Sequence, residues 1–440
     1  MATIKNPGVS LYEKAKKLIP GGTQLLSKRP EMHLPDLWPA YFSRAKGIEV
    51  WDLDNNKYLD MGFHSIGACV LGTADPEVDM AVKRAIDAGT ASTLNCPEEV
   101  ELAELLIGLH PWAEQVRFAR GGGEAMAIAV RIARAATGKD TLAFCGYHGW
   151  HDWYLAANLS SDDALDDHLL PGLSSKGVPR GLKGTALPFR YNDLQALQRI
   201  VADHGQELGA IVMEPIRNFY PNNGFLEGVR TIASDLHIPL IFDEVSAGFR
   251  IALGGAHLKL GVEPDMAVFA KAMGNGYPIA AIIGQKQWMS AAEDSFISST
   301  CWTERVGPVA ALAMIRKFKK YRVHEHLVRI GTLVQQGWKD AAEDSGLSIH
   351  VTGIPPLSHF SIDGGEKQAA RTLFTQEMLK RGYLAGPHFY ATYAHSDEHV
   401  VSYIQNVAEV FKIVQRAIEG GDIRRHLKGP IAHADFHRLT

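Results

Sequence analysis

The sequence lacks the features that would place it in several special classes of protein. Among 440 residues there are only four cysteines, and no two of them form a C-x-x-C pair. This spacing predicts reduced thiols in a cytoplasmic protein and argues against a disulfide framework or a zinc site. No apolar run reaches the roughly 18 residues of a membrane-spanning helix, and the N-terminal stretch has no apolar core like that of a signal peptide.

An excess of charge of one sign is also missing. The chain has 45 Lys and Arg against 49 Asp and Glu, which gives a formal net charge of -4. Nucleic acids and anionic membranes attract basic faces, so we expect neither as a partner. The content of 46% hydrophobic and 21% charged residues is that of a globular protein, and the length predicts two or three domains.

From about residue 75, helix-like and strand-like segments alternate. Helical patterns such as 98–109 and 124–136 separate the short apolar runs QVRFA, TLAFC, LGAIVME, IPLIFDE, MAVFA and IAAIIG. This alternation predicts an α/β fold in which a mostly parallel central sheet carries helices on both faces. Ahead of this region, GIEVWDLDNNKYLDMG has the alternating pattern of a β-hairpin.

The end of the chain predicts a smaller α+β domain. A long helical stretch is followed by the strand-like LSIHVTGIPPLSHFSID and by two helices near 366–381 and 396–418. We expect three segments: 1–60 as the N-terminal segment of the small domain, 61–310 as the large domain, and 311–440 as the C-terminal small domain.

Ligands of such sheets bind outside the carboxyl ends of the strands, and a glycine run lies there. Gly121, Gly122 and Gly123 follow QVRFA and open a helix. They could form a phosphate cup, because glycines let backbone N–H groups at a helix start approach an anion. They could instead form a tight turn that needs glycine for its dihedral angles. The Lys-Ser/Thr of a P-loop is missing, which disfavours a nucleotide triphosphatase.

Two charged residues end neighbouring apolar runs. Asp243 closes IPLIFDE, where a carboxylate needs a partner; it could cap a turn or pair with a protonated ring nitrogen. Lys271 follows MAVFA and could be a desolvated, nucleophilic amine or a lysine whose head reaches water. Together with a phosphate cup they match pyridoxal 5'-phosphate, which takes a Schiff-base lysine and an aspartate at its ring nitrogen. Tyr147, in YHG, supplies an aromatic ring to stack on it.

The motifs RGGGEA, GYHGWHD, MEP, FDEV and KAMGNGYP, in this order, resemble those of the class III aminotransferases of fold type I. LIPGGT and DPEV are similar to the glutamate-1-semialdehyde 2,1-aminomutase branch. The resemblance covers about residues 10–420. It implies that the large domain, 61–310, binds pyridoxal phosphate, that the enzyme is a transaminase with ping-pong kinetics, and that it is a homodimer.

The resemblance also implies residue roles. Lys271 forms the Schiff base and moves the proton, and Asp243 keeps the pyridine nitrogen protonated. The other implied contacts are Tyr147 and Val245 on the two ring faces, Gly121, Gly122 and Gly123 at the phosphate, Glu214 beside the ring hydroxyl or the substrate, Thr300 of the neighbouring subunit at the phosphate, and Arg29 and His148 toward the substrate. His148, His151 and Asp152 stand within a family motif, so we expect no metal site there.

Three departures from the family pattern affect these roles. The usual SGTEA is GGGEA here, so hydroxyl donors to the phosphate are missing. The usual T-x-x-x-N-P appears as STCWTERVGP; counting back from Glu304 selects Thr300, and counting back from Pro308 selects Thr303. We select Thr300. The aminomutase motif NSPVR is replaced by QLLSKRP, which leaves the role of Arg29 open and weakens an aminomutase assignment.

The expected activity is transfer of an amino group, with glutamate as the donor, to a carbonyl substrate. LNCPEEVELAELLIGLHPWAEQVRFAR and GYHGWHDWYLAANL resemble enzymes that aminate oxidised sugars in polysaccharide biosynthesis, such as the 8-amino-3,8-dideoxy-octulosonate transaminases. The alternatives are a glutamate-1-semialdehyde aminomutase, another fold type I activity such as a racemase or decarboxylase, and a non-catalytic regulator that binds pyridoxal phosphate. A regulator would carry a DNA-binding module, for which this chain has no room.

Overall fold

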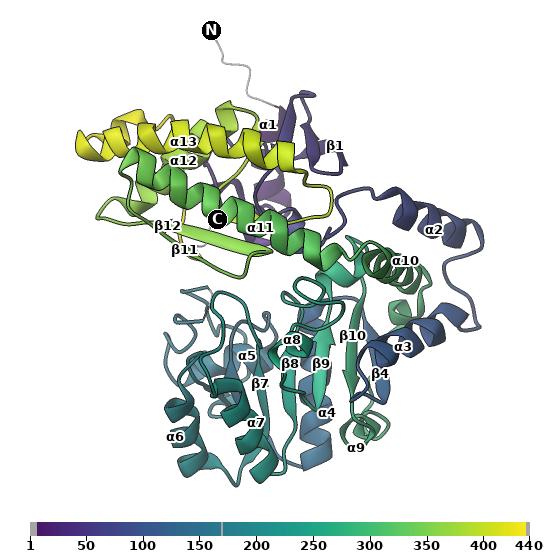
Figure 1. Cartoon of the computed structure of the whole chain (residues 1–440). Coiled ribbons are helices and arrows are strands. Elements are labelled where there is room, and N and C mark those ends of the chain that lie inside the picture. Colours follow the sequence, from purple (N-terminus) through teal and green to yellow (C-terminus); the bar gives the residue numbers. More distant parts are fainter. Residues whose placement is uncertain (1–6, 169, 437–440) are drawn as a thin grey trace. The chain divides into compact units, whose positions relative to one another are not determined.

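The structure is a computed structural model of the chain (Figure 1), and it describes residues 7–168 and 170–436. Its internal contacts divide the chain into two compact units. One unit is the continuous segment Pro76–His324, and the other combines Met1–Asp75 with Glu325–Thr440. These divisions lie at 75 and 324, whereas the sequence pattern predicts them near 60 and 310.

A seven-stranded sheet forms the centre of the continuous unit. In spatial order its strands are β4 (Gln115–Ala119), β10 (Ala280–Gly284), β9 (Met266–Phe269), β8 (Leu240–Asp243), β7 (Leu208–Met213), β5 (Thr141–Cys145) and β6 (Ala186–Pro188). β10 runs antiparallel to both of its neighbours, and the other pairs are parallel. The apolar runs of the sequence form six of these strands, which confirms the predicted mostly parallel sheet; β6 is an additional strand that the pattern does not predict.

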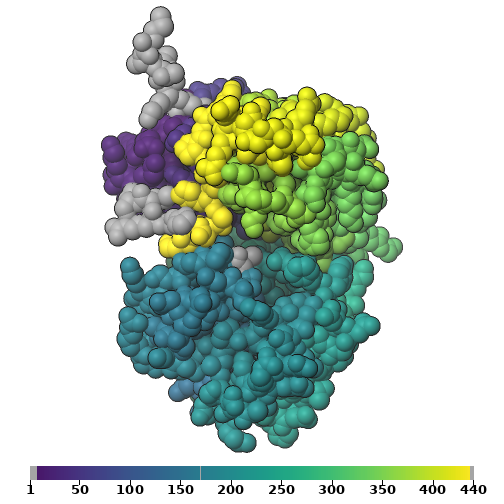
Figure 2. All heavy atoms as spheres, turned by 90° about the vertical axis from the view of Figure 1, so that its left-hand side faces the viewer, coloured from purple at the N-terminus to yellow at the C-terminus, as the bar shows by residue number. Residues whose placement is uncertain are grey.

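Helices cover both faces of this sheet. Alternate residues of each strand point to opposite sides, and apolar residues on both sides pack against helices. Val212 of β7 packs in one cluster with Ile128 of α4 (Gly122–Thr137). Its neighbour Ile211 packs in another cluster with Leu197 of α6 (Leu194–His204) and Val229 of α7 (Phe225–Asp235). Figure 2 shows the α6 and α7 side of this unit in blue and teal. The remaining helices are α2 (Pro76–Asp87), α3 (Pro97–Leu109), α5 (Asp152–Leu155), α8 (His257–Leu260), α9 (Lys286–Met289) and α10 (Val306–Lys320).

The second unit is the α+β part of the chain. One sheet has the order β1 (Phe42–Lys46), β2 (Glu49–Asp52), β3 (Lys57–Asp60) and β13 (Tyr383–Leu384), and the other has β11 (Ile349–Thr352), β12 (Leu357–Ile362) and β14 (His388–Tyr390). Its helices are α1 (Pro7–Leu18), α11 (Val323–Ser345), α12 (Lys367–Lys380) and α13 (Asp397–Glu419). The predicted hairpin is the antiparallel pair β2–β3, and the β3–β13 pairing joins the two ends of the chain in one sheet. Within residues 7–168 and 170–436, no helix is long and apolar enough to cross a membrane.

Candidate active site

The carboxyl ends of the parallel strands bring most of the predicted residues to one edge of the sheet. The strand register pairs Met213 with Phe242 and Asp243 with Val268, so β7, β8 and β9 end at the same level. The segments that follow these strands and β5 carry the candidate side chains. They are Tyr147 and His148 after β5, Glu214 after β7, Asp243 and Val245 at the end of β8, and Lys271 after β9.

Lys271 occupies a strained backbone position. It begins a short 3-10 helix, Lys271–Gly274, with a φ of 44°, which is unusual for a residue with a side chain. The turn then needs two glycines for different reasons. A β-carbon on Gly274 would lie 2.8 Å from Cγ2 of Ile279, and Gly276 has a φ of 97°. Gly274 and Gly276 therefore allow the tight turn that follows Lys271 at the end of β9.

The ε-amine of Lys271 is placed in a hydrogen-bonded and partly desolvated environment. Lys271 is half-buried, and its Nζ donates a hydrogen bond to Oγ of Ser246 over 2.9 Å. Burial lowers the pKa of Lys271 from 10.5 to about 8; the guanidinium of Arg217 also lowers it, whereas the carboxylates of Glu214 and Asp243 act in the opposite direction. A substantial fraction of the amine is therefore neutral, and nucleophilic, close to physiological pH.

Asp243 is buried, and protein groups contact both of its carboxylate oxygens. Oδ2 lies 2.8 Å from Nδ1 of His148, and Oδ1 accepts the backbone N–H of Val245 over 3.0 Å. The other ring nitrogen of His148 lies 3.2 Å from the carbonyl oxygen of Cys145, and its ring stacks on Trp153. The sequence resemblance assigns His148 to the substrate. Because both of its nitrogens face protein atoms, we infer instead that it orients Asp243.

Glu214 connects two segments that follow different strands. Its Oε2 accepts the backbone N–H of Tyr147 over 3.1 Å, and its Oε1 accepts a hydrogen bond from Nη1 of Arg217 over 2.9 Å. Gly146 has a φ of 118°, and a β-carbon on it would lie 2.8 Å from Oε2 of Glu214. Sequence reasoning missed Arg217. The only signal was a cation two residues after MEP, in a loop that follows a fully buried strand.

Two of the three glycines at the start of α4 lie too close to their neighbours for a side chain to be added without movement. None of the three glycines has a positive φ, so the explanation from dihedral angles does not apply to them. A β-carbon on Gly122 would lie 2.7 Å from Cγ1 of Val245, and one on Gly123 would lie 3.1 Å from Nδ1 of His151. Gly121 has room, and Glu124 accepts its N–H over 3.3 Å. The helix start therefore forms a narrow cradle whose dipole favours an anion.

The aromatic residues around this edge divide into core and surface. Tyr147 is half-buried and meets Tyr154 edge to face at 5.9 Å. Trp153 and Tyr154 belong to the hydrophobic core, whereas Trp150 is 71% exposed. In the other unit, Phe389 of the polar stretch HFYATYAHSDEH is also buried. Most of these rings are structural rather than free to contact a sugar.

Two predicted residues lie on segments other than those that follow the parallel strands; the role of Thr300, which the resemblance assigns to the neighbouring subunit, stays a prediction. Thr300 is exposed in the 3-10 helix Thr300–Thr303, and its carbonyl accepts the hydroxyl of Thr303 over 3.1 Å. The carboxylate of Glu304 caps the start of α10, because it accepts hydrogen bonds from the backbone N–H groups of Val306 and Gly307. Arg29 lies in the other unit, at the end of a short 3-10 helix, and its role toward the substrate stays a prediction.

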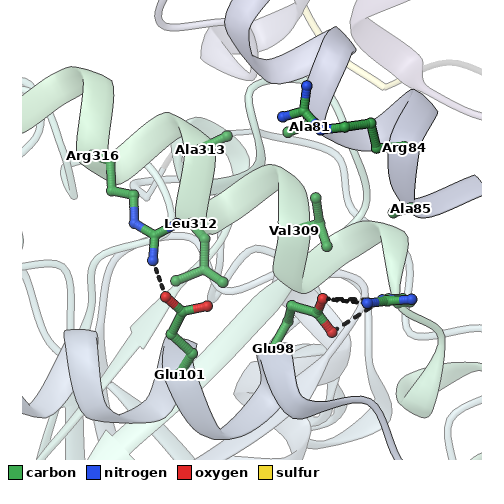
Figure 3. A pocket seen from close by; sticks show the side chains of 10 residues that line it. Ala81, Arg84, Ala85, Glu98, Glu101, Val309, Leu312, Ala313 and Arg316 are labelled. Carbon is green, nitrogen blue, oxygen red and sulfur yellow. Dashed lines mark hydrogen bonds and ion pairs between the residues drawn. The ribbon is translucent and has the colours of Figure 1, made fainter. Parts of the chain in front are cut away.

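A hollow of about 260 Å³ lies between α2, α3 and α10, away from the strand ends described above. Figure 3 shows Arg316 and Glu101 pointing toward each other at this hollow, and Arg305 pairs with Glu98 at 2.6 Å. None of the predicted cofactor-binding residues lines it. Among residues 7–168 and 170–436, no group of three or more His, Cys, Asp or Glu side chains is arranged to hold a metal ion.

The residues at the sheet edge fit pyridoxal 5'-phosphate. The cradle at Gly122 suits its phosphate, the buried carboxylate of Asp243 suits a protonated ring nitrogen, and the amine of Lys271 suits its aldehyde. The fold and these groups define a pyridoxal-phosphate enzyme of fold type I. The sequence model of the family described as aminotransferase class-III matches residues 34–386, so the chain belongs to the class III aminotransferases, which use this cofactor.

Similar proteins agree with this assignment. The chain is 32% identical, over 93% of its length and 98% of that protein, to the 3-aminobutyryl-CoA aminotransferase of Cloacimonas acidaminovorans (strain Evry). The FumI protein of Sphingopyxis sp. MTA144, solved in its PLP internal aldimine form, has a TM-score of 0.85 and 25% identity, with 94% and 97% of the two chains covered. An omega-transaminase from Sphaerobacter thermophilus has a TM-score of 0.83 and 26% identity, with 94% and 99% covered.

Proposed function

We propose that this aminotransferase moves an amino group from glutamate to the carbonyl of an oxidised sugar, with Lys271 as the reacting amine. The observation that carries the residue assignment is the half-buried, low-pKa amine of Lys271 close to the buried carboxylate of Asp243. When bound, pyridoxal phosphate supplies an aldehyde carbon and an electron-accepting ring. The neutral amine of Lys271 can attack a carbonyl carbon with loss of water. Once the amino group of the donor has displaced it from that carbon, the free amine can take a proton from the α-carbon of the donor.

The neighbouring side chains support this role by position and charge. Asp243, held by His148 and by the N–H of Val245, places its carboxylate where it can hold a proton on a ring nitrogen. We assign the amides of Gly122 and Gly123 to the phosphate, because a β-carbon would clash with Val245 at Gly122 and would crowd His151 at Gly123. Tyr147 and Val245 are the proposed contacts on the two faces of the ring.

The proposed donor carries carboxylates, and a cation lies near the amine. Arg217 is 15% exposed at its side chain, is fixed by Glu214, and affects the pKa of both Lys271 and Tyr147. An arginine can bind a carboxylate through two parallel hydrogen bonds. We therefore propose Arg217 as a contact for a carboxylate of glutamate.

The acceptor has a second candidate. The sugar assignment rests on the sequence resemblance around residues 94–120 and 146–159. The 32% identical relative is named for 3-aminobutyryl-CoA, which favours a β-keto acyl thioester as the alternative acceptor. Glutamate-1-semialdehyde aminomutases of Pseudomonas aeruginosa share 18–19% identity with the chain, and this supports the fold alone.

Half-reactions with single amino compounds test the substrates directly. The enzyme loaded with pyridoxal phosphate is mixed with glutamate, with an amino sugar acid or with 3-aminobutyryl-CoA, and the visible absorbance is followed. We expect glutamate and the amino sugar to discharge the visible band in a single turnover. Discharge by glutamate and the thioester, but not by the sugar, would replace the proposed acceptor with the alternative.

We also propose a homodimer. Leu94 is 80% exposed and Phe296 is 90% exposed, and Thr300 lies on the surface of the same unit. Large apolar side chains left in water favour burial against a partner. Light scattering at micromolar concentration is expected to give twice the 48.2 kDa of one chain. A monomer that binds the cofactor with full occupancy would contradict this.

A further inference from the structure

Ser246 lies in direct contact with the reacting lysine. Its hydroxyl accepts the hydrogen bond from Nζ of Lys271 over 2.9 Å, and the residue is only 9% exposed. Its backbone carbonyl accepts a hydrogen bond from Nε of Arg250 over 3.3 Å. Ser246 comes directly after Val245 and three residues after Asp243, so the end of β8 and the loop after it supply three contacts to this site.

We propose that Ser246 is a positioning residue that holds the ε-amine of Lys271 whenever this amine is not joined to the cofactor. A lysine side chain has four rotatable bonds, and holding it in one geometry costs conformational entropy. A buried hydroxyl at hydrogen-bond distance selects the conformations in which Nζ stays at the strand end. The inference rests on the proposed role of Lys271 and adds a residue that controls it.

The choice of a hydroxyl is explained by the charges around the amine. Arg217 and Arg250 lower the pKa of Lys271, and Glu214 and Asp243 raise it. A carboxylate in the place of Ser246 would add a negative charge in contact with Nζ and would keep the amine protonated. The serine oxygen accepts an N–H without adding charge, so the amine is held in place while its pKa remains low enough for it to react.

Labelling of the apoenzyme tests this contact without any turnover. Acetylation of Lys271 by trace acetic anhydride is measured by peptide mass spectrometry between pH 6 and 11, in the wild type and in Ser246→Ala. The ammonium form loses its acceptor in the variant, so we expect the midpoint of labelling to fall by about one pH unit. Ser246→Thr, which keeps a hydroxyl, should restore the midpoint. Ser234→Ala on α7, at an exposed serine, should leave it unchanged.

A second measurement uses the enzyme loaded with pyridoxal phosphate. We expect Ser246→Ala to slow the half-reaction with glutamate by about tenfold at saturating donor, with little change in the concentration needed for half-saturation. Circular dichroism and urea unfolding establish that the variant is folded, and Ser246→Gly replaces it if it is not. An unchanged labelling midpoint together with an unchanged half-reaction rate would overturn the inference.

The two proposals fail in different ways. If borohydride reduction of the loaded enzyme fixes the cofactor to another lysine, the proposed role of Lys271 is wrong. If the cofactor is fixed to Lys271, and Ser246→Ala still labels and reacts like the wild type, only the role of Ser246 is wrong.

Discussion

Gly122 and Val245 face each other so closely that a single β-carbon on the glycine would lie 2.7 Å from Cγ1 of the valine. The first turn of α4 and the loop after β8 therefore meet without room for a side chain. The cradle that we assign to the phosphate and the residue that we assign to one face of the ring are thus parts of one packed contact.

Gly122→Ala should damage this contact, and Gly121→Ala should not. The added methyl group forces Val245 or α4 to move, and such overpacking costs about 1–3 kcal/mol of folding stability. We expect weaker binding of pyridoxal phosphate in the Gly122 variant, measured by titration of the apoenzyme. At Gly121 the nearest atom to a new β-carbon is Cβ of Glu124 at 3.9 Å, so this variant is the matched control. Equal cofactor affinity in both variants would contradict the claim that the contact between Gly122 and Val245 leaves no room for a β-carbon.

Asp243→Asn should retain the fold and lose most of the activity. An amide has nearly the shape of the carboxylate but no charge with which to hold a proton on a ring nitrogen. We expect the half-reaction with glutamate to slow by about 100-fold or more. His148→Gln should have a smaller effect, because it removes an orienting contact rather than the charge. Stopped-flow absorbance gives both rates, and an Asp243→Asn rate close to that of the wild type would argue against the role of Asp243.

The low pKa of Lys271 should also be visible in folding stability. The folded pKa is about 8 and the usual value is 10.5, so below pH 8 the folded apoenzyme bears the full cost of a destabilised ammonium. This cost is on the order of 3 kcal/mol, and it disappears as the pH rises from 8 toward 10.5. Lys271→Met should therefore unfold at higher urea than the wild type at pH 7, and the difference should shrink at pH 10. Lys286→Met, on the surface at α9, is the control. A constant difference at both pH values would contradict a lowered pKa.

In the other unit, His395 should make folding sensitive to acid. Burial, and then the neighbouring His64, lower its pKa from 6.5 to about 3, and its Nδ1 accepts the N–H of Thr392. The unfolded chain takes up a proton below pH 6.5 and the folded chain does not, so stability falls as the pH falls from 6.5 toward 3. From pH 7 to pH 5 the loss due to this one group is about 2 kcal/mol. The free energy of unfolding, measured with urea, should fall by less in His395→Gln than in the wild type between pH 7 and pH 5. An equal fall in both proteins would show that His395 does not contribute.

Much of the sheet, and the position of Asp243 and Lys271 at its edge, could be predicted from the sequence. Runs such as MAVFA and IPLIF are apolar throughout because both faces of these strands are covered, and the residue after each run then lies at the sheet edge. The apolar pattern alone therefore predicts that Asp243 and Lys271 share one edge. The antiparallel direction of β10 and the short strand β6 could not be predicted, because neither leaves a distinct pattern in the sequence.

The contacts within the site were harder to predict. The interaction of Ser246 with Lys271, and that of Glu214 with the backbone of Tyr147, join residues far apart in the sequence. They depend on distances that only the packed sheet determines. The role of His148 shows the same limit, since its motif indicated a functional residue but not which group it contacts.

The central claim is that Lys271 is the lysine that binds pyridoxal phosphate covalently. The most direct measurement is borohydride reduction of the loaded wild-type enzyme, followed by peptide mass spectrometry, with Lys271→Ala treated in parallel. We predict a phosphopyridoxyl group on the peptide that contains Lys271, and none in the variant. A phosphopyridoxyl group on a different lysine of the wild type, or an equal yield in Lys271→Ala, would contradict the account.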